Sequence, residues 1–208
     1  MTTQVRASRM HLLNAILSAN RDFLHPGAFP PLPKNPQKQL AIFTCMDTRL
    51  VDFLEPSMGI KRGDAKVIKN AGNTLVDPLH GGVIRSLVAA IFTLGVEEIF
   101  VIGHEDCGMA DINPDRLKND MIARGISPRA IETLVPDLAQ WLGAFACPAE
   151  NVTQVVGKIR CNPLIPSDVP VHGLIFCPND GRLELLVNGY KAQGFDQKNQ
   201  RALPEGNR

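Results

Sequence analysis

The chain has 208 residues, of which 44% are hydrophobic and 21% charged, a composition typical of one globular domain with its own core. Its 22 basic and 21 acidic residues leave a formal net charge of +1 without a long basic run, which argues against a nucleic-acid binder. No stretch has the length and purity of a transmembrane helix, and the N-terminus lacks a signal-peptide pattern. With five widely spaced cysteines, these features predict a cytoplasmic protein with reduced thiols.

The N-terminal part of the chain has the pattern of a helical arm. Residues 4–24 place apolar side chains at roughly helical spacing, which predicts an amphipathic helix. Residues 25–34 contain four prolines and one glycine and should form an extended linker. Because a helix set apart in this way often packs against another chain, we expect residues 1–34 to lie on a second subunit. A core domain over 35–190 and a polar tail over 191–208 should follow.

The core domain alternates short apolar runs with amphipathic segments. Helices are expected over 77–94, 113–124, 127–142 and 151–160, and strands over 40–44, 65–68, 98–103, 171–177 and 182–187. A Pro-Asn-Asp-Gly turn at 178–181 separates the last two strands. This order predicts an α/β fold with a mainly parallel central sheet, flanked by helices and closed by an antiparallel C-terminal hairpin. In such sheets ligands bind at the carboxyl ends of the strands.

Three residues at that edge have the chemistry of metal ligands. The first expected strand ends at Cys45 and the third at His104, and Cys107 follows three residues later on the turn. Two thiolates and one imidazole suit Zn²⁺, and three protein ligands leave a fourth position for water, as in catalytic zinc sites. The plainer alternative is a buried pair of cysteines beside a core histidine. The convergence of all three at strand ends favours the metal site.

Asp47 and Arg49 follow the first of these cysteines by two and four residues. A carboxylate beside a guanidinium stays ionised and keeps a fixed orientation. We therefore expect Asp47 to accept a hydrogen bond from a zinc-bound hydroxide, although a surface salt bridge is the simpler alternative. Because two thiolates neutralise the ion, the site should be a weak Lewis acid whose activity favours alkaline pH.

Three motifs together resemble those of the β-class carbonic anhydrases. They are Cys-Met-Asp-Thr-Arg at 45–49, Lys-Asn-Ala-Gly-Asn at 69–73 and Gly-His-Glu-Asp-Cys-Gly-Met at 103–109. The likeness is closest to the compact branch found in archaea and bacteria, which includes carbonyl sulfide hydrolase-like members. It extends from the first strand to Tyr190 and so covers most of the chain.

The resemblance implies an enzyme that hydrates carbon dioxide reversibly to bicarbonate and a proton. Zn²⁺ would be held by Cys45, His104 and Cys107, the catalytic pair would be Asp47 and Arg49, and the Gly108 backbone N–H would orient the substrate. It also implies a homodimer or higher homo-oligomer in which the N-terminal helix crosses to the partner, in agreement with the expected arm.

Several alternatives stay open at this point. In some family members the catalytic aspartate binds zinc in place of water, with bicarbonate held by a tryptophan, an arginine and a tyrosine. Since neither Trp141 nor Tyr190 is near the expected positions, we expect the open form.

Glu105 stands where a small polar residue is more usual, either as a solvent-facing turn residue or as a change at the pocket entrance. Hydrolysis of carbonyl sulfide or carbon disulfide, and a non-catalytic zinc protein, are the alternative functions.

Overall fold

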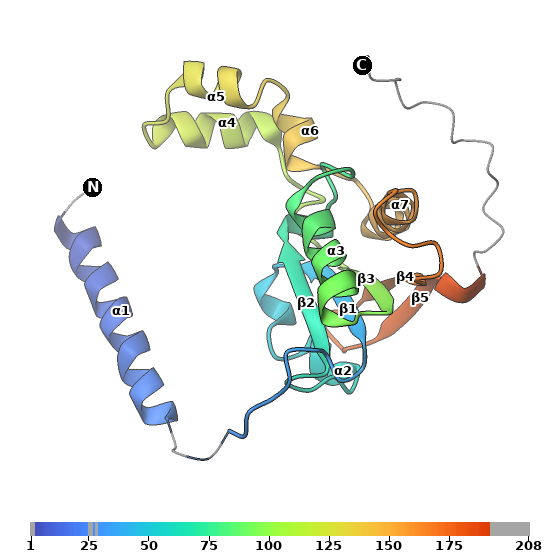
Figure 1. Ribbon diagram of the computed structural model, residues 1–208. Helices are drawn as coiled ribbons and strands as arrows, with labels where there is room; N and C mark the ends of the chain where they lie inside the picture. Colours follow the sequence, from blue (N-terminus) through green and yellow to red (C-terminus); the bar gives the residue numbers. More distant parts are fainter. Residues whose placement is uncertain (1–2, 25–26, 28, 192–208) are drawn as a thin grey trace, which may run out of the picture. The chain divides into compact units, whose positions relative to one another are not determined.

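The computed structural model describes residues 3–24, 27 and 29–191 (Figure 1). Nearly all of the expected polar tail, 192–208, lies outside this range. The chain divides into two compact units, of which the second begins at Lys34. In the first unit, helix α1 (Thr3–Phe23) confirms the expected N-terminal helix, and Phe23 stacks on Phe29 in the segment that follows it. No helix within the described ranges is long and apolar enough to cross a membrane.

The second unit is built on a sheet whose strands stand in the order β2-β1-β3-β4-β5. The strands are β1 (Leu40–Cys45), β2 (Ala65–Asn70), β3 (Glu98–His104), β4 (Val171–Phe176) and β5 (Leu183–Val187). The pairs β1–β2, β1–β3 and β3–β4 are parallel, whereas β4–β5 is an antiparallel hairpin (Figure 1). The predicted fold class is therefore confirmed.

Strand register brings the chemically active strand ends to one edge. Cys45 pairs with Asn70 at the end of β2, and Thr44 pairs with Ile102 of β3. The last residue of β3, His104, is therefore near the level at which β1 ends. The Thr44 hydroxyl also donates to the Ile102 carbonyl at 2.8 Å, which ties the two strands together beside the site. The parallel geometry thus places residues from separate segments of the chain side by side.

Each face of the sheet has its own apolar core. One core joins β1 and β3 to α3 (Gly82–Leu94) and α7 (Pro148–Arg160), through residues such as Phe43, Leu87 and Val155. The other joins the same strands to α2 (Leu54–Ser57) through Ile42, Leu54 and Ile102. Cys45 and Cys107 belong to the second core. Because an apolar core covers each face of the sheet, the central strands have nearly continuous apolar sequences.

Between β3 and α7 the chain forms α4 (Pro114–Ala123), α5 (Pro128–Leu134) and α6 (Leu138–Leu142). A single helix over 127–142 was expected, and this was wrong, because Pro136 stands between α5 and α6 and supplies no backbone N–H. The expected start at Asp77 was also wrong. There the Asp77 carboxylate accepts the N–H groups of Leu79 and His80, and this local turn delays α3 until Gly82.

Candidate active site

The structure brings Cys45, His104 and Cys107 together at the carboxyl edge of the sheet. The exposed fractions of the three residues are 4%, 1% and 2%, and their donor atoms all lie within 4.8 Å of one another. The two sulfurs are 3.9 Å apart, and both cysteines are free thiols. A disulfide, with sulfurs about 2 Å apart, is therefore absent here, and the arrangement is that of a chelating site.

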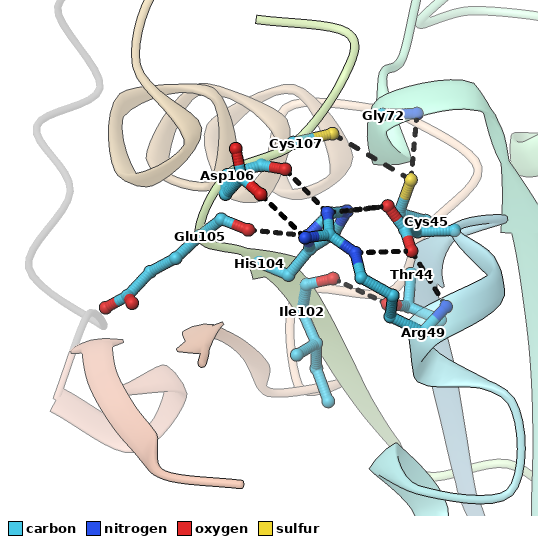
Figure 2. Close-up of polar contacts among 10 residues, drawn as sticks. Thr44, Cys45, Arg49, Gly72, Ile102, His104, Glu105, Asp106 and Cys107 are labelled. Carbon is cyan, nitrogen blue, oxygen red and sulfur yellow. Dashed lines mark hydrogen bonds and ion pairs between the residues drawn. The ribbon is translucent and has the colours of Figure 1, made fainter. Parts of the chain in front are cut away.

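The Cys45 sulfur is positioned by the turn that follows β2. In the 3-10 turn η2 (Ala71–Asn73), the Gly72 N–H donates to Cys45 Sγ at 3.3 Å (Figure 2). The Gly72 φ of +67° is left-handed, and a Cβ there would come within 2.9 Å of Met109 and Phe145. The Asn151 amide of α7 donates to the Gly72 carbonyl at 3.1 Å and holds the turn in place. Only glycine fits this position.

His104 presents one defined nitrogen to the two sulfurs. Its Nδ1 lies 2.8 Å from the Glu105 carbonyl oxygen, which accepts only, so Nδ1 carries the proton and Nε2 keeps its lone pair. Nε2 is buried and has no hydrogen-bond partner among the described residues. A buried nitrogen lone pair of this kind is a polar group that a metal ion would satisfy.

Each of the two thiols changes the acidity of the other. The Cys107 S–H donates to the Cys45 sulfur, which lowers the pKa of Cys45 and raises the pKa of Cys107. Burial opposes a charge on His104, but the neighbouring Cys45 sulfur, the Glu105 carbonyl and the Asp47 carboxylate raise the pKa of His104 overall. The pocket therefore already favours a thiolate at Cys45.

The donor set fits a zinc ion. Two Zn–S bonds of about 2.3 Å at a tetrahedral angle place their sulfurs about 3.8 Å apart. The observed separation between Cys45 and Cys107 is 3.9 Å. The unpaired Nε2 of His104 supplies the third donor from within the same 4.8 Å group. Zinc binds sulfur and imidazole donors well, whereas magnesium and calcium prefer oxygen donors.

Asp47 and Arg49 form an ion pair next to these donors. Asp47 caps the 3-10 turn η1 (Thr48–Leu50), and its Oδ1 accepts the backbone N–H and the Nε–H of Arg49 at 2.8 and 3.0 Å. Its Oδ2 accepts Arg49 Nη2 at 2.9 Å and lies 3.7 Å from His104 Nε2. The Arg49 guanidinium lowers the pKa of Asp47 to about 2, and the carboxylate in turn raises the pKa of Arg49. Asp47 is thus an ionised acceptor that faces the donor group.

The structure adds a residue that the sequence analysis gave no role, Asp106. Arg49 Nη1 donates to Asp106 Oδ2 and Arg49 Nη2 to the Asp106 carbonyl, both at 2.6 Å (Figure 2). Asp106 has a left-handed φ of +52°. The available signal was an aspartate on a sharp turn between two ligand candidates, since Asp tolerates this conformation better than most residues.

The structure also places four further residues that the sequence singled out, namely Gly108, Glu105, Trp141 and Tyr190. Gly108 is exposed, and a Cβ there would have no atom within 4 Å, so its backbone lies beside open space. The Glu105 side chain points away from the donors (Figure 2), and its Oε1 lies 3.4 Å from Arg182 Nη2. Trp141 is 56% exposed on α6. The Tyr190 hydroxyl donates to Glu98 at 2.5 Å, at the end of β3 opposite His104.

The chain resembles known proteins over most of its length. β-Carbonic anhydrase 1 of Mycobacterium tuberculosis is 34% identical over 175 residues, which cover 84% of this chain and 97% of that protein. A carbon disulfide hydrolase of an Acidianus species is 31% identical over 160 residues, or 70% of this chain and 74% of that protein. The crystal structure of β-carbonic anhydrase isoform I from Trichomonas vaginalis is 44% identical and superposes with a TM-score of 0.82, covering 86% of this chain and 98% of that one.

These relatives confirm the resemblance that the three motifs carried. The family model described as carbonic anhydrase matches residues 40–183, which run from the first residue of β1 to the first residue of β5. The matched range includes every residue of the donor group and of the Asp47–Arg49 pair. The chain therefore belongs to the carbonic anhydrase family of enzymes.

Proposed function

We propose that this protein catalyses the reversible hydration of carbon dioxide to bicarbonate and a proton, with Zn²⁺ held by Cys45, His104 and Cys107. The observation that supports this most is the buried convergence of two sulfurs and one unpaired imidazole nitrogen within 4.8 Å, with an ionised carboxylate beside them. When bound, Zn²⁺ would supply a Lewis acid that lowers the pKa of a water and so makes it nucleophilic.

In this proposal Asp47 orients the nucleophile. An ionised carboxylate is only an acceptor, so a water hydrogen-bonded to Asp47 Oδ2 directs its own lone pair elsewhere, toward the substrate carbon. With its pKa lowered to about 2, Asp47 is too weak a base to store the proton of the reaction at neutral pH. Asp47 therefore aligns the attack, Arg49 holds Asp47 in place, and the proton leaves through another carrier.

Gly108 is proposed to bind the substrate through its backbone N–H. The residue directly follows Cys107, and the space at its Cβ position is open to 4 Å. A backbone N–H aimed at a substrate oxygen stabilises the negative charge that grows there as the carbon is attacked. We also propose the open form of the site, in which Asp47 stays with Arg49, because that bidentate pair uses both oxygens of Asp47.

The pH dependence of the reaction follows from the charges in the site. Two thiolates and a neutral imidazole cancel the charge of the ion, so the pKa of the attacking water should exceed the value of about 7 found with three histidine ligands. Asp47 remains charged at any pH well above its pKa of about 2, and Arg49 remains protonated because its pKa is raised. We expect kcat to rise with pH through neutrality in a single step, measured by stopped-flow hydration in buffers of constant ionic strength. A rate already flat at neutral pH would contradict this.

The experiment that tests the function is stopped-flow proton release from carbon dioxide on protein of known zinc content, with carbonyl sulfide and carbon disulfide run in parallel. Fast carbon dioxide turnover at about one zinc per chain is the expected result. Full zinc occupancy without carbon dioxide turnover would refute the proposal. In that case, turnover of a sulfur compound would indicate a hydrolase, and its absence would indicate a non-catalytic zinc protein.

The alternative function is the hydrolysis of carbonyl sulfide or carbon disulfide. It is supported by the carbon disulfide hydrolase of Acidianus, which is 31% identical over 160 residues. Both compounds are linear molecules with an electrophilic central carbon, like carbon dioxide, so the same nucleophile and the same Asp47 orientation would serve. Neither compound requires a different donor group, which is why the parallel assay is needed.

We also propose that the chain forms a homodimer or higher homo-oligomer. Helix α1 belongs to a unit of its own, and Leu12, Leu13, Ile16 and Leu17 on it are each about half exposed or more. Apolar side chains on an amphipathic helix are expected to be buried against another surface. Light scattering during size-exclusion chromatography should give at least twice the 22.7 kDa chain mass. A mass of one chain at micromolar concentration would refute this proposal.

A further inference from the structure

Arg49 binds two carboxylates at once. One is Asp47, through Nε–H and Nη2–H, and the other residue is Asp106, through Nη1–H to its side chain and Nη2–H to its carbonyl. These contacts use four of the five N–H groups of the guanidinium. The plane of the guanidinium is therefore fixed from two sides (Figure 2).

The second anchor lies within the segment that carries two of the three donors. Asp106 stands between His104 and Cys107, and its φ of +52° turns both its carboxylate and its carbonyl toward Arg49. A non-glycine residue held in the left-handed region usually serves a local purpose, because its Cβ makes this conformation strained. Arg49 thus joins the end of β1 to the turn after β3.

The consequence is geometric rather than energetic. The Arg49 and Asp106 side chains are 38% and 77% exposed, and an ion pair so exposed adds little to folding stability. Without the Asp106 carboxylate, Asp47 and the Asp106 carbonyl would still hold the guanidinium, but its Nη1 end would lose its anchor. The Asp47–Arg49 pair could then shift as a unit relative to the donors.

We propose that Asp106 is a positioning residue: it orients Arg49, and through Arg49 it aims the Asp47 carboxylate at the position of the nucleophile. The kinetic part of this inference rests on the proposed function, whereas the contact between Asp106 and Arg49 can be tested without it. Asp106 touches neither the substrate nor the metal in this account.

Three variants separate the side chain from the backbone conformation. Asp106→Gly keeps the left-handed turn and the carbonyl bond but removes the carboxylate, and Asp106→Asn keeps the turn and one acceptor for Nη1. Asp111→Asn is the matched control, since it removes the charge of an exposed aspartate just after the same turn. Because misplacing a catalytic group by about 1 Å can cost up to about 100-fold, we expect kcat to fall about tenfold or more in Asp106→Gly. Asp106→Asn should stay within about threefold and Asp111→Asn should be unchanged, by the same geometric reasoning.

Zinc content and melting temperature should be unchanged in all three variants, which distinguishes positioning from a loss of the metal site. In an Asp47→Asn background, Asp106→Gly should cost little more, because the group that it positions is already disabled. Loss of zinc in parallel with activity, full additivity in the double variant, or wild-type kcat in Asp106→Gly would each overturn the proposal.

A readout independent of activity is the side-chain Nε–H signal of Arg49 in ¹⁵N NMR spectra of the zinc-loaded protein, assigned by its loss in Arg49→Lys. Exchange of this proton with solvent should be slow in the wild type and in Asp106→Asn, and clearly faster in Asp106→Gly. Equal exchange in the wild type and in Asp106→Gly would overturn the inference. If the protein hydrates no carbon dioxide, this measurement still decides whether Asp106 orients Arg49, so the two proposals fail separately.

Discussion

Replacing Cys45 with alanine is expected to abolish metal binding and catalysis together. The change removes one of the three donors. Only the buried Cys107 sulfur and His104 Nε2 then remain to hold a metal ion. Loss of residues that merely support metal ligands typically costs 10–100-fold in affinity, so loss of a ligand should cost more than about 100-fold. Hydration of carbon dioxide should fall to the uncatalysed rate.

The fold should survive this substitution. Cys45 is 4% exposed at the end of β1, and truncation of a side chain this small in a core costs about 1 kcal/mol. Zinc per chain after dialysis, stopped-flow rates and thermal unfolding should be measured on the same preparation. Cys161→Ala is the control, because Cys161 is an exposed thiol at the end of α7 and should leave all three quantities unchanged. A Cys45→Ala protein that keeps one zinc per chain would refute the proposed ligand set.

The sheet and the donor group could be predicted because both depend on short-range patterns. Each strand is a brief apolar run, and parallel strands end at one edge, which places Cys45 and His104 on the same edge of the sheet. The observed pairing of β1 with β3 makes the two residues neighbours there. His104 and Cys107 lie three residues apart, which brings them together without further information. The position of this group follows from the sequence because few alternatives are compatible with that topology.

The contacts that fine-tune the site could not be predicted, because they depend on backbone angles and on residues distant in sequence. The Gly72 N–H reaches the Cys45 sulfur only through the left-handed turn after β2. Asp106 reaches Arg49 across 57 residues, and only because its own φ is positive. The split between α5 and α6 was missed for a different reason: apolar periodicity persisted through Pro136 and outweighed the signal of one proline. In both the unpredicted site contacts and the missed helix break, the backbone conformation at a few residues determined the structure.

Replacing Asp47 with asparagine should disable the reaction without removing the metal. Asparagine has nearly the same shape and can still accept the Arg49 backbone N–H at the start of η1, but it offers a neutral amide where Oδ2 carried charge toward the donors. Removing one well-aimed group of this kind typically costs 10²–10³-fold, so kcat should fall at least about 100-fold. Zinc content should stay near one per chain, because Asp47 is outside the proposed ligand set.

The pH dependence of the variant separates orientation from proton transfer. The pKa of Asp47 is lowered to about 2, so this carboxylate is charged throughout the working range in the wild type. Its loss should therefore lower kcat throughout the working range, as measured by stopped-flow hydration beside Asp111→Asn. Because the Asp47 charge also raises the pKa of neighbouring groups, its removal should move the midpoint of the profile, if at all, to lower pH. A midpoint that moves to higher pH would refute the role of Asp47 as a fixed, charged acceptor.

The same lowered pKa has a consequence for folding with a definite sign. Because the carboxyl is a stronger acid in the folded chain than in the unfolded one, the Asp47–Arg49 pair stabilises the fold at neutral pH, and this contribution is lost as pH falls toward 2. Arg49 is partly exposed and solvent screens the ion pair, so the effect should be small. The difference in unfolding free energy between the wild type and Asp47→Asn should thus shrink as pH falls toward 2, as measured by chemical denaturation at neutral and at acidic pH. A difference that stays constant over this range would show that the charge on Asp47 does not stabilise the fold.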